Sequence, residues 1–248
     1  MQRIFSSGSV PEGSITIVGA DAHHLARVLR MRPGEEIIVS SPGGTDHICR
    51  IDTVSGDCVT ATVIKTEANN AEPPYRAVLL QGMPKGDKTD VIVQKAVELG
   101  VHSVVFAVTE RSVARPDGAS LAKKTERLCR ISESAAAQSG RGEVPEVRSL
   151  GGFEDMLNEA KQADVALFCY EGGGDELSRI LSEVSCEVRE RKDFSVAIII
   201  GPEGGFSHKE ADAAKAAGIR PCSLGGRILR TETAGSHVLS CLAYEFDK

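Results

Sequence analysis

The chain has 248 residues, 41% of them hydrophobic and 26% charged, which is the balance of an ordinary globular protein. No apolar run approaches the roughly twenty residues that cross a bilayer. The N-terminal MQRIFSSGSV lacks the apolar core of a signal peptide, so we expect a cytoplasmic protein. The net charge of −6 argues against a protein that coats nucleic acid through bulk charge, although it leaves room for local basic patches. Seven cysteines without a C-x-x-C pair predict neither a disulfide framework nor a metal site.

The first seventy residues predict a small β-barrel or sandwich. Short, β-branched and often alternating runs are separated by turns rich in Gly, Pro and Asp, and we expect strands at 14–18, 36–40, 47–54 and 58–65. One helix interrupts them, with Asp21 as its N-cap and with Leu25, Val28 and Leu29 on its apolar face. We place a first domain at 1–70 and a polar, turn-rich linker at 67–74.

Basic residues lie off the apolar face of that helix, and two interpretations of them stay open. His24, Arg27, Arg30 and Arg32 suit a solvated helix edge, which is the usual fate of such charges. The same arginines also suit contact with a phosphate backbone.

After the linker the pattern changes to strands that alternate with helices. We expect strands at 77–81, 104–108 and 165–169, and helices at 87–99 and 121–138. Strands separated by helical stretches of this length predict an α/β fold with a mostly parallel sheet covered on both faces. The second domain is placed at 74–248.

The last quarter of the chain contains two glycine-rich turns that follow apolar strands. The strand at 196–200 ends at Gly201–Gly205, and Ser207 with Glu210 forms the capping box of the next helix. A short strand at 221–224 ends at Gly225-Gly226, before a polar segment at 227–233 and a closing helix. Either loop alone is as typical of an ordinary turn as of a site, but two such loops at the carboxyl ends of buried strands favour ligand binding.

Two nucleotide-binding motifs are excluded by single positions. The stretch 82–89, GMPKGDKT, nearly matches a P-loop, but Asp87 replaces the last glycine and would repel a phosphate. Asp87 is better interpreted as a helix N-cap, and Lys85 and Lys88 as exposed, solvated cations. The loop at 201–205 is no dinucleotide fingerprint, because no acidic residue follows at the end of the next strand. We therefore expect neither an ATPase nor a Rossmann oxidoreductase.

The segment at 227–233, RILRTET, is the strongest candidate active site. It places two arginines, a carboxylate and two hydroxyls between a glycine turn and an apolar helix. A helix N-terminus capped by Thr231 or Thr233 explains the hydroxyls and Glu232. It does not explain Arg227 and Arg230, which we expect to pair with Glu203.

These residues resemble a known family. The strings IGPEGG at 200–205 and LGGRILRTETA at 224–234 are similar to the signature of the RsmE family, RNA methyltransferases of the SPOUT superfamily. Other stretches resemble the family in the same order, namely HHLARVLR at 23–30, KGDK at 85–88, QKAVELG at 94–100, ERS at 110–112 and ESAAAQSGR at 133–141.

The resemblance implies an S-adenosylmethionine-dependent enzyme that methylates N3 of one uridine in 16S rRNA, near the decoding region of the small ribosomal subunit. It also implies a PUA-like N-terminal barrel, a C-terminal SPOUT α/β domain with a trefoil knot, and a homodimer that has no contact with membranes. Loops at 168–172, 201–205 and 223–229 are implied to hold the cofactor. The cofactor-binding set is Phe168, Tyr170, Ile200, Gly201, Pro202, Glu203, Gly204, Gly205, Leu224, Gly225, Arg227, Ile228, Leu229 and Thr233.

The chemistry of this reaction suggests roles for two further residues. Methylation at N3 needs the ring nitrogen to lose its weakly acidic proton, so Glu232 is the candidate base and Arg230 the candidate stabiliser of charge on the uracil oxygens. The predicted RNA contacts are Arg27, Arg30 and Arg32 in the first domain and Arg111 and Arg141 in the second. Three alternatives stay open: a SPOUT enzyme that acts on another RNA such as tRNA, a non-catalytic RNA-binding protein, and a metabolic α/β enzyme.

Overall fold

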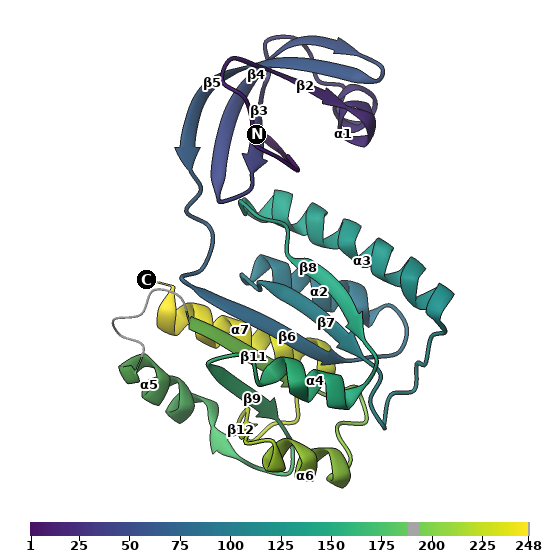
Figure 1. The fold of residues 1–248 in the computed structure, drawn as a ribbon, viewed down its shortest axis with the longest axis vertical. Helices are drawn as coiled ribbons and strands as arrows, with labels where there is room; N and C mark the ends of the chain where they lie inside the picture. The colour runs from purple at the N-terminus through teal and green to yellow at the C-terminus, as the bar shows by residue number, and fades with distance from the viewer. Residues whose placement is uncertain (188–193, 248) are drawn as a thin grey trace. The chain divides into compact units, whose positions relative to one another are not determined.

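The computed structural model describes residues 1–187 and 194–247, and the chain forms two compact units. The first unit contains Met1–Glu72 and, returning later in the sequence, Ala136–Val144. The second contains Pro73–Ala135 and the rest of the chain from Pro145. Figure 1 shows the order of the elements along the chain.

The first unit is built on a five-stranded mixed sheet. Its strands are β1 (Gln2–Phe5), β2 (Ser14–Val18), β3 (Glu36–Ser41), β4 (Thr45–Ser55) and β5 (Cys58–Ala68), in the order β1-β3-β4-β5-β2. Only β1 and β3 run parallel. The alternation of apolar residues predicted from the sequence is confirmed, because Ile37, Ile51 and Val59 lie fully buried in one core.

The predicted N-terminal helix differs in detail from the observed one. Asp21 lies within α1 (Gly19–His23), so it is not the N-cap, and α1 continues into a π-helical turn, η1 (His24–Val28). The wider turn changes which residues share a face. Leu25 is buried as predicted, whereas Val28 and Leu29 are exposed.

The predicted linker at 67–74 is largely an ordered part of the first unit. The strand β5 extends to Ala68, and the amide of Asn69 donates to the carbonyl of Gly140 at 3.0 Å. The carboxylate of Glu72 accepts from the guanidinium of Arg141 and from the backbone N–H of Gly142. These bonds attach the chain before residue 73 to the segment that follows the long helix.

The second unit contains a seven-stranded sheet in which every pairing is parallel. The strand order is β10-β12-β9-β11-β6-β7-β8. Their bounds are β6 (Tyr75–Gly82), β7 (Ser103–Ala107), β8 (Glu146–Leu150), β9 (Val165–Cys169), β10 (Asp175–Glu176), β11 (Phe194–Ile200) and β12 (Arg220–Ser223). This arrangement confirms the α/β fold with a mostly parallel sheet.

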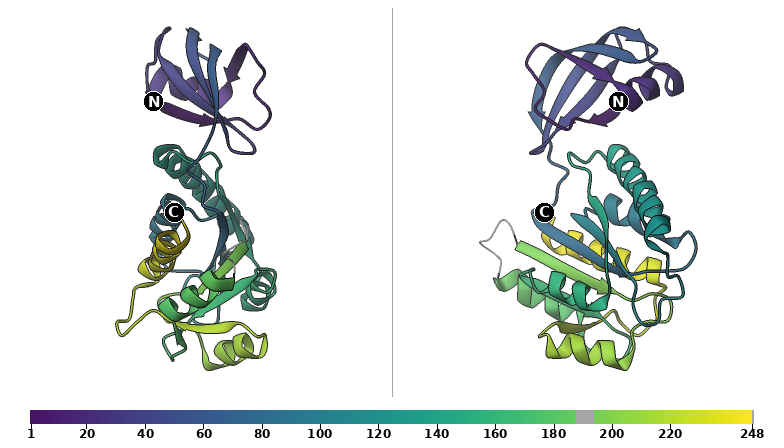
Figure 2. Two further views of the ribbon diagram at one scale, coloured as in Figure 1. Left: turned by 90° about the vertical axis from the view of Figure 1, so that its left-hand side faces the viewer. Right: turned by 45° about the vertical axis from the view of Figure 1, so that its right-hand side comes forward.

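Helices cover both faces of this sheet (Figure 2). They are α2 (Lys88–Glu98), α3 (Gly118–Ser139), α4 (Phe153–Ala160), α5 (Leu177–Glu187), α6 (His208–Ala216) and α7 (Thr231–Phe246). Residues of α4 and α6 share one core cluster with β6, β7, β9 and β11, while α2 and α7 lie side by side on the other face. Within the described residues, no helix has the length and apolar character needed to cross a membrane.

Candidate functional site

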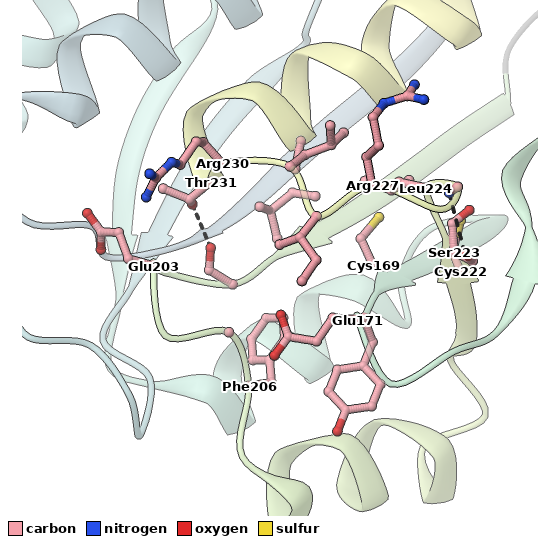
Figure 3. Close-up of a pocket in the computed structure, with 18 of the residues that line it drawn as sticks. Cys169, Glu171, Glu203, Phe206, Cys222, Ser223, Leu224, Arg227, Arg230 and Thr231 are labelled. Atoms are coloured by element: carbon pink, nitrogen blue, oxygen red, sulfur yellow. Dashed lines mark hydrogen bonds between the residues drawn. The ribbon is translucent and has the colours of Figure 1, made fainter.

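The parallel sheet brings the ends of three strands to one edge. Strand β9 lies between β11 and β12, so the loops that follow these three strands are neighbours although they lie far apart in the sequence. They enclose a cavity of about 650 Å³ (Figure 3). Its lining consists of Cys169, Tyr170, Glu171, Ile200, Gly201, Pro202, Glu203, Gly205, Phe206, Cys222, Ser223, Leu224, Gly225, Gly226, Arg227, Ile228, Leu229, Arg230, Thr231 and Ala234.

The loop after β9 forms one wall with Cys169, Tyr170 and Glu171. The backbone N–H of Tyr170 donates to the carbonyl of Cys222 at 3.2 Å, which ties this loop to β12. Phe168, a predicted cofactor residue, does not line the cavity. It is 0% exposed and packs against Phe206, with ring centroids 4.7 Å apart. Successive side chains of a strand point to opposite faces, so Phe168 enters the core while Cys169 lines the cavity.

The loop after β11, from Gly201 to Gly205, is held by close backbone contacts. The carbonyl oxygen of Gly201 accepts hydrogen bonds from Thr231 Oγ1 at 2.6 Å and from Gln81 Nε2 at 3.2 Å. Gly205 has a φ of +65°, in the left-handed region that favours glycine. A Cβ atom there would also lie 2.8 Å from the carboxylate of Glu171, across the cavity wall.

Gly204, the fourth residue of that loop, was predicted to bind the cofactor but lies outside the cavity lining. It is exposed, and its carbonyl accepts a hydrogen bond of 2.9 Å from Arg111 Nη1. The loop therefore presents Gly201 and Gly205 to the cavity and Gly204 to the outer surface.

The third wall is the loop after β12 together with the start of α7. Gly225 has a φ of +98°, and the loop leads through Arg227, Ile228 and Leu229 to Arg230, the N-cap of α7. The predicted caps, Thr231 and Thr233, are both wrong, because these residues lie within α7 and the N-cap is Arg230. Thr231 and Ala234 face the cavity. Thr233 is exposed and, like Glu232, lies outside the lining, so its place in the cofactor set stays a prediction.

An ion cluster lies beside this cavity, but its cation differs from the predicted ones. The ammonium of Lys88 is 3.1 Å from Glu203 Oε1 and 3.3 Å from Glu232 Oε2. Among the residues that the structure describes, neither Arg227 nor Arg230 forms an ion pair. Figure 3 shows Arg230 on the same side of the cavity as Glu203, and Arg227 on the opposite side. The expected pairing of arginines with Glu203 is therefore wrong, and Lys88 is not the solvated cation that we expected.

The surroundings of Glu203 and Lys88 favour the ionised form of both groups. Partial burial raises the pKa of Glu203, but hydrogen bonds from its own backbone, from Lys88 and from the backbone N–H of Lys85 outweigh that effect and hold the pKa below its usual value. The hydrogen bond to Glu203 is the largest of the effects that raise the pKa of Lys88. Glu232 Oε2 is buried, and its contact with Lys88 is electrostatic rather than a well-aligned hydrogen bond.

Four of the five predicted RNA contacts are exposed. Arg27, Arg30 and Arg32 lie on the surface of the first unit, and Arg30 has a φ of +54°. Arg111 lies on the surface beside the cofactor loop of the second unit. Arg141 is only 4% exposed and its guanidinium is held by Glu72 at 2.5 Å, so its prediction as a phosphate contact is wrong.

Sequence reasoning missed several residues of the site. Cys169, Glu171, Ser223, Gly226 and Thr231 line the cavity but are not in the predicted cofactor set, although each lies next to a predicted site residue. Phe206 and Cys222 also line the cavity, although from the sequence alone both would be expected in the hydrophobic core. Gln81 lies inside a buried strand, and its amide donates to Thr231 at 2.8 Å, beneath the loops.

Comparison with protein families matches both parts of the chain. Residues 71–243 match the RNA methyltransferase domain family, and residues 17–64 match the RNA methyltransferase PUA domain family. Ribosomal RNA small subunit methyltransferase E of Bacillus subtilis is 36% identical over 99% of this chain and 97% of its own length. The chain belongs to the RsmE family.

Another curated relative and two solved structures extend the comparison. Ribosomal RNA small subunit methyltransferase E of Synechocystis is 30% identical over 92% of this chain and 72% of its own length. The RsmE protein of Neisseria gonorrhoeae, crystallised bound to S-adenosyl methionine, has a TM-score of 0.85 and 29% identity over 98% of this chain and 97% of its own. A methyltransferase of Legionella pneumophila, crystallised with SAM, has the same TM-score and identity over 98% of this chain and 96% of its own.

Proposed function

We propose that this protein uses S-adenosylmethionine to methylate N3 of one uridine in 16S rRNA, near the decoding region of the small ribosomal subunit. The observation that carries the proposal is the cavity formed by the loops after β9, β11 and β12, with Arg230 and Glu232 at the start of the adjacent helix. Membership of the RsmE family and the cofactor-bound relatives support the same conclusion.

The residues of the cavity fit such a cofactor. The volume of about 650 Å³ is in the range of small-molecule sites, and the lining mixes apolar side chains with backbone groups of glycine loops. Gly201, Gly205 and Gly225 let the backbone approach a ligand closely. Tyr170, Leu224 and Leu229 supply apolar contact around it. When bound, S-adenosylmethionine supplies an electrophilic methyl group on a sulfonium centre.

The residues at the start of α7 fit the preparation of the uridine. The ring nitrogen must lose its proton, and we assign that proton to the carboxylate of Glu232. The guanidinium of Arg230, at the N-cap of α7, donates to the uracil oxygen on which negative charge develops. Much of the rate then comes from holding the base and the methyl donor in line.

The substrate is assigned to ribosomal RNA rather than tRNA because the relative of Bacillus subtilis, similar over the whole chain, is a ribosomal RNA small subunit methyltransferase. The exposed Arg27, Arg30 and Arg32 supply phosphate contacts from that unit, and Arg111 supplies one beside the cofactor loop. The target base must leave its stack to reach the cavity.

We also propose that the protein is a cytoplasmic homodimer whose second unit contains a trefoil knot. Both α2 and α7 expose a large apolar side chain, Val91 on α2 and Tyr244, 83% exposed, on α7, and such side chains suit contact with a second copy of the chain. Light scattering of the wild type and of Tyr244→Glu tests the dimer, since a charge within such an interface should yield monomers. The backbone trace of an experimental structure tests the knot.

The test of the reaction is to incubate the protein with methyl-labelled S-adenosylmethionine and with small subunits, free 16S rRNA or tRNA. We expect label in 16S rRNA at a single uridine, located by nuclease digestion and mass spectrometry. Glu232→Gln should abolish transfer while calorimetry shows unchanged cofactor binding.

Two results would contradict parts of this proposal. Label in tRNA alone would reassign the substrate while leaving the cofactor assignment intact. Full turnover by Glu232→Gln with normal cofactor binding would remove Glu232 as the base.

A further inference from the structure

Lys88 connects three elements of the site. It is the first residue of α2, and its side chain is 27% exposed. Its ammonium contacts Glu203, on the glycine loop after β11, and Glu232, the second residue of α7. One cation therefore joins the loop that lines the cavity to the helix that carries the proposed base.

The position of Lys88 is unfavourable for the helix itself. The N-terminus of a helix carries partial positive charge, so a lysine at its first position is repelled by the helix dipole. The two carboxylates that its ammonium contacts offset that cost. The sequence of α2 does not require a cation here, because the buried face of the helix is formed by Ile92, Val93, Ala96 and Val97.

The two carboxylates would repel each other without this cation. Both lie within ion-pair distance of the same nitrogen atom, so their negative charges are close together. A like charge nearby makes a carboxylate retain a proton, and a protonated carboxyl group cannot accept the proton of the uridine.

We propose that Lys88 is a positioning residue for methyl transfer, the shared counter-ion that offsets the repulsion between Glu203 and Glu232 and fixes Glu232 towards the target uridine. The inference rests on the proposed function, in which Glu232 accepts the N3 proton. Lys88 itself does not line the cavity, so it acts through Glu232 and does not contact the cofactor.

Other charged groups near the cluster are accounted for differently. Glu203 also accepts from the backbone N–H of Lys85, and Arg111 is bound to the carbonyl of Gly204. Asp90, on the same helix as Lys88, pairs with Arg127. Asp87 precedes Lys88 and is exposed, and Arg230 precedes α7. Within the described part of the chain, Lys88 is thus the cation that contacts both carboxylates.

The decisive experiment measures single-turnover methylation of 16S rRNA against pH for Lys88→Met, Lys88→Arg and the double variant Lys88→Met/Glu203→Gln. We expect Lys88→Met to lose about tenfold or more in rate at neutral pH, because Glu232 is no longer held in place. The acidic limb of its profile should move by about one pH unit to higher pH, because two carboxylates then compete for one proton. Lys88→Arg should retain most of the rate, since it keeps the shared charge.

The double variant separates an electrostatic role from a merely structural one. Removing the charge of Glu203 removes the repulsion, so the acidic limb of Lys88→Met/Glu203→Gln should return towards that of the wild type. Lys95→Met is the matched control, because Lys95 lies on the same helix and pairs with Glu98 away from the cavity. Calorimetry with S-adenosylmethionine and thermal unfolding are measured for each variant.

A Lys88→Met variant with an unchanged rate and pH profile overturns the inference, as does a rate loss that only tracks the unfolded fraction. Failure of the proposed function would be seen in a different variant, because Glu232→Gln would then show normal turnover. An inactive Glu232→Gln together with an unaffected Lys88→Met leaves the proposed function intact and removes Lys88 alone.

Discussion

The hydroxyl of Thr231 donates a 2.6 Å hydrogen bond to the carbonyl oxygen of Gly201, and the amide of Gln81 donates to both of these oxygen atoms. The first turn of α7 is thereby attached to the glycine loop after β11. These hydrogen bonds hold the start of α7, which carries the proposed catalytic residues Arg230 and Glu232, at a fixed distance from the glycine loop. Neither Arg230 nor Glu232 takes part in the bonds.

Replacing Thr231 by valine should therefore loosen the site while preserving its shape. We expect a loss of about 1 kcal/mol in stability, and a loss of about fivefold in affinity for S-adenosylmethionine, measured by calorimetry. Thr53→Val, which removes an exposed cross-strand hydroxyl pair in the first unit, is the control. Equal cofactor affinity of wild type and Thr231→Val would show that the bond does not position the loop.

Gly82→Ala should disturb the same loop by steric conflict. A Cβ atom at Gly82 would lie 2.6 Å from Cδ and 2.8 Å from the nitrogen of Pro202, and the proline ring has little freedom to move. We expect a destabilisation of about 1–3 kcal/mol in urea unfolding, with weaker cofactor binding. Gly118→Ala has no atom within 4 Å of the added methyl group and should behave as the wild type.

The first unit should lose stability in acid through Asp46. Burial raises the pKa of this carboxyl, but hydrogen bonds from Arg3, Asn69 and Ser40 outweigh burial and hold the pKa below its usual value. A carboxyl with a lowered folded-state pKa contributes stability above its unfolded value, about 3.9, and this contribution is lost as pH falls through the folded value.

Asp46→Asn should consequently flatten the dependence of unfolding free energy on pH below about 4. At neutral pH it should cost about 3 kcal/mol, because buried Arg3 keeps its charge without a charged partner. Urea unfolding of both proteins from pH 2 to 7 measures the difference. Parallel curves over that range would contradict the assignment.

The exposed arginines of the first unit should control RNA affinity through phosphate contacts. Replacing Arg27 and Arg30 together by glutamine should weaken RNA binding and reduce the slope of log K against log salt by about two. Cofactor affinity, measured separately, should not change. An unchanged slope would remove both arginines from the interface.

Arg141→Met should affect stability rather than RNA binding. Its guanidinium is buried against Glu72, and its loss leaves that carboxylate without its cation. We expect a cost of about 3 kcal/mol in unfolding free energy. The slope of RNA affinity with salt should stay at the wild-type value, which distinguishes Arg141 from Arg27 and Arg30.

The sequence predicted those parts of the fold whose signals are local. Strand β9 was predicted with its observed bounds, and the capping box of Ser207 and Glu210 is present. The helices α4 and α5 and the strands β1 and β8 were not predicted, because their apolar patterns are short and interrupted by charges.

The wrong predictions about the site concern which side chains point into the cavity and which charged groups form ion pairs. Phe168 and Cys169 are adjacent in one strand, and sequence alone does not say which of the two faces the ligand edge. Lys88 looked like a solvated cation because both of its partners lie far away in the sequence. Only the strand order of the sheet brings Glu203 and Glu232 to it.

The place of β12 between β9 and β10 has a consequence for synthesis. Strands β9 and β10 are synthesised first, and β12, which pairs between them, follows about fifty residues later. Strand β10 therefore cannot pair with β12 until Arg220–Ser223 has left the ribosome. The nascent chain cannot enclose a methyl donor before Ala234 emerges, because the third wall of the cavity is still missing. An incompletely translated copy therefore lacks a complete cofactor site.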